Sequence, residues 1–268
     1  ADTNPELVYA KQNSIPTIER AVLLGALMSS YSKSIAVSGT HGKTTTSTML
    51  AHLLNQRKQG VNAFLGGISK NYQSNLLVSS TSNEVVVEAD EYDRSFHHLS
   101  PYMSVITSMD ADHLDVYGTE ENYRDSFLHY ASLVSNALVV KRGLDIPVDD
   151  LKATVYTYTV EQQDASFSAR NIRFADGVIV FDFHAPNAII LDMRLCVPAW
   201  VNVENSVAAL AIAYLLGLTE QELRDGLASF TGVYRRFNLH VNKSLVSYID
   251  DYAHHPEELK ASIKSVKK

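Results

Sequence analysis

A glycine-containing loop near residue 40 has the residue types and the spacing of a phosphate-binding site. The apolar residues 35–37 lead into Ser38-Gly39-Thr40-His41-Gly42-Lys43-Thr44-Thr45-Thr46, and a helical pattern begins at Lys43. A loop between a buried strand and a helix N-terminus directs free backbone N–H groups toward one point, where phosphate oxygens can bind. Lys43 would reach the terminal phosphates, and the hydroxyl of Thr44 would bind magnesium. The loop therefore predicts a site for ATP and Mg²⁺.

The length of this loop distinguishes it from the widespread Walker pattern. Val37 occupies the position five residues before Gly42 at which that pattern has its first glycine, so the loop is the shorter G-x-x-G-K-T form. A glycine turn followed by a chance Lys-Thr pair is the alternative explanation. The strand before the loop and the helix after it favour a phosphate site, with contacts to ATP expected from Gly39, Thr40, His41, Gly42, Lys43, Thr44 and Thr45.

Two further predicted strands also end in residues that bind metal ions. Glu88 follows the apolar residues 85–87, and His113 lies in the loop Asp110-Ala111-Asp112-His113-Leu114-Asp115 after residues 105–106. The carboxyl ends of parallel strands lie at one edge of the sheet, where ligands bind, and a carboxylate near a phosphate loop commonly holds magnesium. Taken alone, the first segment is equally compatible with a solvated acidic loop. The repeated position at strand ends favours Glu88 and His113 as metal ligands.

The remaining pattern predicts an α/β fold. Apolar runs alternate with helical stretches, as in a mostly parallel sheet covered by helices on both faces. A small antiparallel patch is predicted around Ala175-Asp176-Gly177, which is typical of a hairpin turn, with strands at 165–174, 178–183 and 189–197. Helices are expected at 4–12, 17–29, 121–133, 203–216 and 220–229, followed by a strand at 245–249 and a helix from Pro256.

The composition argues against several classes of protein. Hydrophobic residues make up 46% and charged residues 20% of the 268-residue chain, so a sizeable core is expected. The formal net charge of −7 argues against nucleic-acid binding, and no apolar stretch is long enough for membrane insertion. The polar residues 1–6 differ from a signal peptide, and a cytoplasmic protein is expected. The single cysteine, Cys196, cannot form an intrachain disulfide and is predicted to be buried.

Six segments of the chain resemble motifs of the Mur ligase family, and they occur in the family's order. Besides the phosphate loop they are Glu88-Ala89-Asp90-Glu91, Ala111-Asp112-His113-Leu114-Asp115, Asn202-Val203-Glu204-Asn205, Arg235-Arg236-Phe237 and Asp250-Asp251-Tyr252-Ala253-His254-His255-Pro256. The resemblance implies that residues 1–33 end a domain that binds a UDP sugar and that residues 34–234 form the central ATP-binding ligase domain. Residues 235–268 are then expected to begin a Rossmann-like C-terminal domain.

The resemblance also implies roles for individual residues. Lys43 and Thr44 match the triphosphate and first-magnesium positions, and Glu88 and His113 match the ligands of a second magnesium. Asn202 and Asn205 match residues that contact adenine, Arg236 matches a residue that contacts phosphate, and Asp251 matches one that contacts the ribose. His254 and His255 match part of a motif near the sugar-nucleotide and amino-acid site. The implied catalytic residues are Lys43, Glu88, His113 and Arg236.

Two positions bear on which member of the family the chain resembles. Val201 stands where the family has a histidine, which leaves the details of adenine recognition open. Relatives that add later amino acids carry a modified lysine where this chain has Phe127, as alanine-adding members do. The resemblance therefore implies an ATP-dependent ligase of bacterial peptidoglycan precursor synthesis that joins L-alanine to UDP-N-acetylmuramate through an acyl phosphate. A tripeptide ligase of peptidoglycan recycling and a fragment that only binds nucleotide are the alternatives.

Overall fold

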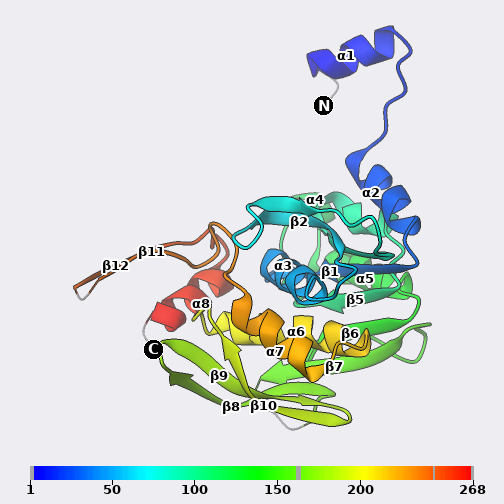
Figure 1. Ribbon diagram of the computed structural model, residues 1–268. Helices are drawn as coiled ribbons and strands as arrows, with labels where there is room; N and C mark the ends of the chain where they lie inside the picture. Colours follow the sequence, from blue (N-terminus) through cyan, green and yellow to red (C-terminus); the bar gives the residue numbers. More distant parts are fainter. Residues whose placement is uncertain (1–2, 161–163, 244, 267–268) are drawn as a thin grey trace.

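A ten-stranded sheet forms the centre of the computed structural model, which describes residues 3–160, 164–243 and 245–266 (Figure 1). Its strands are β1 (Lys33–Ser38), β2 (Asn62–Ser69), β3 (Ser74–Leu77), β4 (Glu84–Glu88), β5 (Met103–Ile106), β6 (Ala137–Lys141), β7 (Thr154–Val160), β8 (Phe167–Ala175), β9 (Val178–Ala185) and β10 (Ala188–Leu195). They are ordered β10-β9-β8-β7-β6-β5-β1-β4-β2-β3. Neighbours from β8 across to β2 run parallel, and β10, β9 and β3 are antiparallel to their neighbours.

Helices cover both faces of this sheet. One face carries three helices that pack on one another and on the strands: α3 (Lys43–Leu54), α6 (Val201–Leu215) and α7 (Glu220–Ser229). The other face carries α2 (Arg20–Ser29), the 3-10 helix η1 (Tyr92–His98), α4 (Leu114–Tyr117) and α5 (Glu120–Ser132). Each face has its own cluster of buried hydrophobic side chains.

The central strand β1 shows why the sequence contains unbroken apolar runs. Ile35 and Val37 belong to the hydrophobic cluster beneath α3, and Ala36 belongs to the cluster on the opposite face. Successive side chains of a strand point to opposite faces, so a strand covered on both sides needs apolar residues at every position. β1 ends at Ser38, and the chain then leaves the sheet to form the glycine loop.

The structure confirms the predicted α/β class and corrects several details. The apolar run 61–65 predicts a strand that ends at Gly66-Gly67, whereas β2 continues to Ser69, and β3 and β7 were not predicted. The residues of β7 alternate threonine with tyrosine and valine, which gives a weaker signal than an apolar run. The predicted antiparallel patch is present, and β8 joins it to the parallel part of the sheet. The prediction that Cys196 is buried is wrong, because the buried residues on either side of it point inward and Cys196 points outward.

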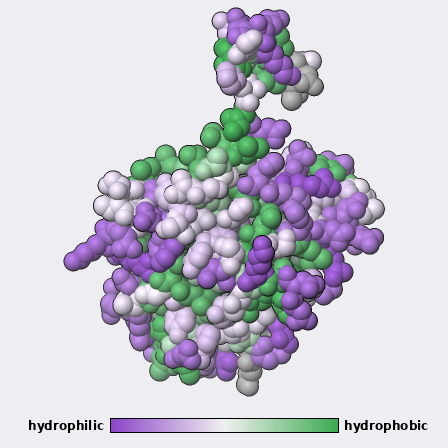
Figure 2. Space-filling model, turned by 90° about the vertical axis from the view of Figure 1, so that its right-hand side faces the viewer, coloured by the Kyte–Doolittle hydropathy of each residue, from purple (hydrophilic) through white to green (hydrophobic). Residues whose placement is uncertain are grey.

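The two ends of the chain extend from this body. The helix α1 (Pro5–Gln12) stands away from the sheet at the end of an extended connection (Figure 1). Figure 2 shows hydrophobic side chains gathered where this connection meets the body. At the other end, β11 (Asn238–Lys243) and β12 (Val246–Asp250) form a hairpin that projects outward, followed by α8 (Pro256–Val266). Among the residues that the structure describes, no helix is long and apolar enough to cross a membrane.

The position of α8 matters for the site, because it lies against the start of α6. The backbone N–H of Trp200 donates to the hydroxyl of Ser265 at 3.0 Å. The strand β11 was also absent from the sequence prediction, which placed only the second strand of this hairpin. The C-terminal segment is therefore packed beside the central sheet and can contribute residues to the site.

A buried histidine makes the stability of this fold depend on pH. His52, on α3, lies between the hydroxyls of Tyr72 at 2.7 Å and Ser229 at 2.9 Å, and burial lowers its pKa to about 4. The unfolded chain binds this proton near pH 6.5, so stability that is present at pH 7 is lost as the pH falls from about 6.5 to 4. The contribution lost is about 3 kcal/mol, from roughly 2.5 pKa units at 1.36 kcal/mol each.

Urea unfolding of wild type and His52→Gln at pH 7 and pH 4 measures this contribution. The stability difference between the two proteins is expected to shift by about 3 kcal/mol against wild type at the lower pH. Other titrating groups affect both proteins equally and cancel in the comparison. A difference that stays constant across this range would contradict the assignment.

Candidate active site

The glycine loop joins β1 to α3, and two of its glycines cannot be replaced without a clash. Gly39 has φ of 127°, and a Cβ there would lie 2.2 Å from the Thr107 hydroxyl. Gly42 has φ of 82°, and a Cβ there would lie 2.7 Å from Oδ1 of Asn205. Both positions therefore need glycine for the backbone angle and for the close approach. The tight loop begins α3 at Lys43 with its N-terminal backbone N–H groups directed toward the edge of the sheet.

The segment that follows β5 supports this loop from one side. The backbone N–H of His41 donates to the hydroxyl of Ser108 at 2.8 Å, and the hydroxyl of Thr40 donates to the carbonyl of Asp110 at 2.8 Å. The hydroxyl of Thr107 donates to the carbonyl of His41. These bonds fix the shape of the loop through partners that lie about seventy residues further along the chain.

The ammonium of Lys43 is held by its own loop and by a carboxylate. It donates to the carbonyl of Gly39 at 2.8 Å and to Oε1 of Glu91 at 2.8 Å, and it lies 2.7 Å from the second oxygen of Glu91. Glu91 is 1% exposed, and burial raises its pKa although the charge of Lys43 opposes that shift. Glu91 was not predicted to contact Lys43. Its place three residues after a strand-end carboxylate was the only available signal.

Glu88 lies at the end of β4 and is suited to hold a divalent cation. Burial raises the pKa of its carboxyl, an effect that the nearby charge of Lys43 and a hydrogen bond with Thr44 oppose. Within the described part of the chain, its Oε2 is buried and has no hydrogen-bond partner. A Cβ at Gly66 would lie 2.1 Å from this oxygen, so a glycine on β2 leaves room for it. A carboxylate oxygen without a protein donor, beside a threonine hydroxyl, fits the oxygen ligands that magnesium prefers.

His113 lies in the loop after β5 in a left-handed backbone conformation, with φ of 54°. Its backbone N–H donates to Oδ1 of Asp112 at 2.7 Å, and its ring meets the ring of Tyr92 edge-on at 5.1 Å. Tyr92 belongs to the segment that follows Glu88. The loops after β4 and β5 therefore meet at His113.

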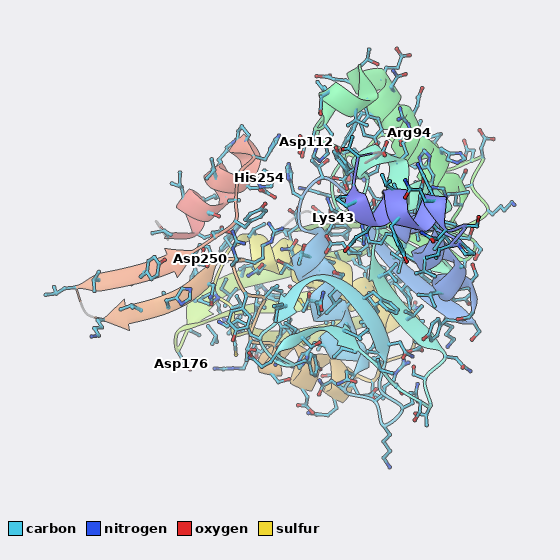
Figure 3. All side chains as sticks on the ribbon, turned by 90° about the horizontal axis from the view of Figure 1, so that it is seen from above. Lys43, Arg94, Asp112, Asp176, Asp250 and His254 are labelled. Carbon is cyan, nitrogen blue, oxygen red and sulfur yellow. The ribbon has the colours of Figure 1, made fainter. Side chains whose placement is uncertain are left out.

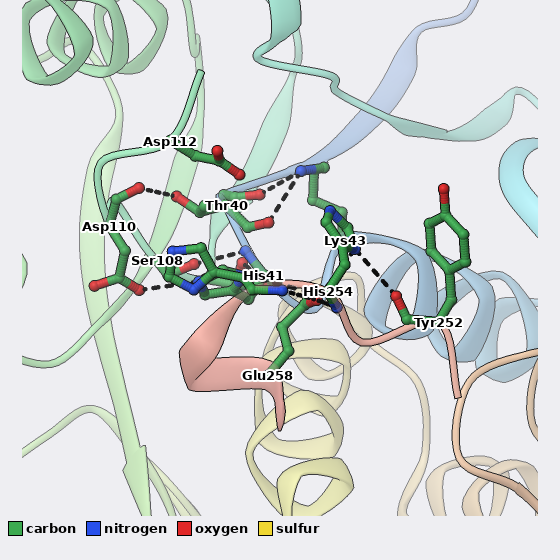
Figure 4. Close-up of polar contacts among 12 residues, drawn as sticks. Thr40, His41, Lys43, Ser108, Asp110, Asp112, Tyr252, His254 and Glu258 are labelled. Atoms are coloured by element: carbon green, nitrogen blue, oxygen red, sulfur yellow. Dashed lines mark hydrogen bonds and ion pairs between the residues drawn. The ribbon is translucent and has the colours of Figure 1, made fainter. Parts of the chain in front are cut away.

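The three predicted loops gather at one edge of the sheet. Lys43 joins the glycine loop to Glu91, Thr40 joins it to Asp110, and His113 joins the second and third loops through Tyr92. Figure 3 and Figure 4 show Lys43, Asp112 and His254 close together at this edge. Residues 3–160, 164–243 and 245–266 contain no group of three or more His, Cys, Asp or Glu side chains that could by itself hold a metal ion.

A cavity of about 400 Å³ lies beside the glycine loop, between the start of α6 and the C-terminal segment. Asn205 lies at its wall, where its side-chain amide donates to Oδ1 of Asn202 at 3.2 Å and its own Oδ1 accepts from Thr46 at 3.3 Å. Lys141 and Glu204, which are 3.0 Å apart, also line the cavity and were not predicted. The predicted residues that line it are His41, Gly42, Thr45, Asn202, Asn205, Arg236 and Asp251.

The C-terminal segment brings Arg236 and Asp251 to this cavity, and the two histidines predicted to bind substrate lie outside its described lining. The ring of His255 lies 4.5 Å from the ring of His41, whereas His254 is exposed and its Nδ1 lies 3.0 Å from the carbonyl of Tyr252. Arg236 lies 4.0 Å from Oε1 of Glu258. Burial would raise the pKa of Glu258, but hydrogen bonds from His41 and from the backbone of His254 lower it to about 2.

Comparison with known proteins agrees with this arrangement. Residues 37–213 match the family model described as the Mur ligase middle domain. The chain belongs to the Mur ligase family. Among curated Mur ligases, it is 51% identical to the UDP-N-acetylmuramate–L-alanine ligase of Porphyromonas gingivalis over 98% of its length, and 50% identical to that of Phocaeicola vulgatus over 99%. The chain spans 58% of the length of each of these relatives.

Solved structures of Mur ligases have the same fold. The structure of the UDP-N-acetylmuramate–alanine ligase of Thermotoga maritima matches all of the chain with a TM-score of 0.84 and 27% identity, and the match covers 61% of that protein. The murein peptide ligase of Psychrobacter arcticus matches with a TM-score of 0.76 at 20% identity, which shows similarity of fold alone. The predicted family and fold are thus confirmed.

Proposed function

We propose that the full-length protein is an ATP-dependent ligase that joins L-alanine to the lactyl carboxylate of UDP-N-acetylmuramate. The observation that carries this proposal is the meeting of the loops containing Lys43, Glu88 and His113 at one edge of the sheet. The names of the relatives that are about half identical to the chain give the substrates. We further propose that residues 34–234 are the central ligase domain, and that residues 1–33 and 235–268 belong to its two neighbours.

ATP would bind across the glycine loop and the adjoining cavity. The triphosphate would lie over the loop, where Lys43 exchanges its bond with Glu91 for the terminal phosphates. The adenine would occupy the cavity beside Asn202 and Asn205, and Asp251 would face the ribose. Val201 lines this cavity in place of the family histidine, so an apolar side chain would contact the base.

The reaction would proceed in two steps. The lactyl carboxylate attacks the γ-phosphate, which gives an acyl phosphate and ADP. The amine of alanine then attacks the acyl carbon, and inorganic phosphate leaves. Positioning and neutralisation of charge account for most of the catalysis in such transfers. Lys43 would offset charge on the phosphates, and Arg236 would approach them from the C-terminal side.

Magnesium would be held by Thr44, Glu88 and His113. When bound, it would reduce the repulsion between the anionic nucleophile and the triphosphate. Because ATP and L-alanine are metabolites of the bacterial cytoplasm, the proposed reaction takes place there, as a step in peptidoglycan precursor synthesis and hence in cell-wall formation.

The choice of amine distinguishes this proposal from a tripeptide ligase of peptidoglycan recycling. Phe127 is fully buried among Phe96 and Tyr123, and it offers no polar group such as the modified lysine of relatives that add later amino acids. We expect ADP release by the full-length protein to require UDP-N-acetylmuramate together with L-alanine. A coupled assay with L-alanine or the tripeptide as amine tests this. Release that requires the tripeptide would favour the recycling reaction, and ATP binding without any release would favour a nucleotide-binding role.

A further inference from the structure

Glu258, in the first turn of α8, faces its own helix with one oxygen and the phosphate loop with the other. Oε2 accepts the backbone N–H groups of His254 at 3.2 Å and His255 at 3.5 Å, which lie at the N-terminus of the helix. Oε1 lies 3.4 Å from Nδ1 of His41 and 4.0 Å from Arg236. Figure 4 shows this carboxylate reaching from α8 toward the loop. Capping a helix requires only the first of these two sets of contacts.

The second oxygen of Glu258 faces the ring of His41, whose backbone is fixed by the segment after β5. The backbone N–H of His41 donates to Ser108 at 2.8 Å, and its Nε2 lies 3.5 Å from Oδ2 of Asp110. The ring therefore lies between Asp110 on one side and Glu258 on the other. A loop residue fixed in this way can transmit the position of the phosphate loop to the C-terminal segment.

The contact joins two walls of one cavity. His41 lies on the wall formed by the glycine loop, and Arg236 and Asp251 lie on the wall formed by the C-terminal segment. The Glu258 side chain is 15% exposed, so water screens its contacts only partly. Charged hydrogen bonds in such an environment are stronger than neutral ones.

We infer that Glu258 is a positioning residue that ties the C-terminal segment to the phosphate loop through His41, and thereby holds Arg236 and Asp251 at the nucleotide. The inference rests on the proposed function, because it concerns how tightly the same cavity binds ATP. It assigns Glu258 a part in nucleotide affinity that is separate from capping α8.

The variant Glu258→Gln separates these two parts. Glutamine keeps an oxygen for the helix cap, and it turns an amide NH₂ toward His41 and the cationic Arg236. We expect the Kd of the full-length protein for Mg-ATP, measured by isothermal titration calorimetry, to rise about tenfold, the effect of losing one charged hydrogen bond. The thermal midpoint is expected to change little.

Glu222→Gln is the matched control. Glu222 occupies the same position in α7, where it caps the helix with Thr219, and it does not line the cavity. Its replacement is expected to leave the Kd within about twofold of wild type. An equal rise in Kd for the control would mean that loss of a helix cap anywhere weakens binding, and it would overturn the inference.

A double-mutant cycle with His41→Gln tests the route of the effect. If Glu258 acts through His41, the double variant binds about as weakly as the weaker single variant. Effects that multiply in full, or a Glu258→Gln protein with unchanged Kd, would overturn the inference while the proposed function stands. A wild-type protein that fails to bind Mg-ATP would contradict the proposed function itself, and with it this inference.

Discussion

Replacing Lys43 with alanine in the full-length protein is expected to lower kcat/KM for ATP by about a thousandfold, the usual cost of removing one group that stabilises transition-state charge. Lys43 is the first residue of α3, at the edge where the three loops meet. Its ammonium lies 2.8 Å from the carbonyl oxygen of Gly39 and 2.8 Å from Oε1 of Glu91. In water-poor surroundings its charge would act strongly on a transferring phosphoryl group. ADP release in the presence of UDP-N-acetylmuramate and L-alanine measures the loss.

Lys33→Ala provides the control for this variant. Lys33 begins the same strand, β1, at the opposite edge of the sheet, where it lies 3.8 Å from Glu84. Its removal is expected to leave kcat/KM within about twofold of wild type, since an exposed lysine 3.8 Å from its partner contributes little. If Lys43→Ala retained kcat/KM within about tenfold of wild type, the assignment of the phosphate site would be wrong.

Replacing Glu88 with glutamine is expected to reduce activity without weakening the fold. The change keeps the shape of the side chain and removes the charge that would hold magnesium, so kcat should fall at least about a hundredfold and the Mg²⁺ requirement should rise. Burial raises the pKa of Glu88. The charged carboxylate therefore opposes folding at neutral pH, and the glutamine variant should be at least as stable as wild type there.

The stability difference between Glu88→Gln and wild type is expected to depend on pH. A carboxyl whose pKa is raised on folding contributes its full stability below the unfolded value near 4.5, and that stability is lost as the pH rises through the folded value. The stability advantage of Glu88→Gln should thus be present at pH 7 and disappear below about pH 4.5. Urea unfolding at both pH values, together with the ADP-release assay, measures the two effects separately.

Glu84→Gln tests the same substitution at the other end of β4. Glu84 is buried, and its carboxylate bonds to Arg57 at 2.9 Å. Removing this charge leaves the partly buried guanidinium of Arg57 without its counterion, which should cost about 3 kcal/mol of stability and leave the catalytic parameters close to wild type. Equal activity of Glu88→Gln and wild type at low Mg²⁺ concentration would contradict the metal assignment.

The parts of the fold that the sequence predicted are those with strong local patterns. β1 and β4 are short apolar runs, and α3 and α6 have long helical patterns, so their positions followed from periodicity. The strand β7 was missed because five of its seven positions are threonine or tyrosine. The strand β11 was missed because, in the described part of the chain, it pairs with β12 alone, and the side chains of Leu239, His240 and Lys243 are exposed, so burial imposes no apolar pattern.

The site could be predicted in part for a related reason. Residues at the ends of parallel strands must lie at one edge, so the meeting of the loops that hold Lys43, Glu88 and His113 followed from topology. The partners of these residues depend on packing that no local pattern records. Glu91 meets Lys43 across 48 positions of sequence, and Glu258 meets His41 from a helix more than two hundred residues away. Such contacts become visible only in the folded chain.

A crystal structure of the full-length protein with a non-hydrolysable ATP analogue and Mn²⁺ tests the central claim most directly, since anomalous scattering locates the metal. We expect a metal peak within coordination distance of the Thr44 hydroxyl and the Glu88 carboxylate, with the terminal phosphate beside Lys43. The adenine should lie in the cavity next to Asn202 and Asn205. A metal peak or a nucleotide on a different surface, with this edge of the sheet filled only by solvent, would contradict the claim.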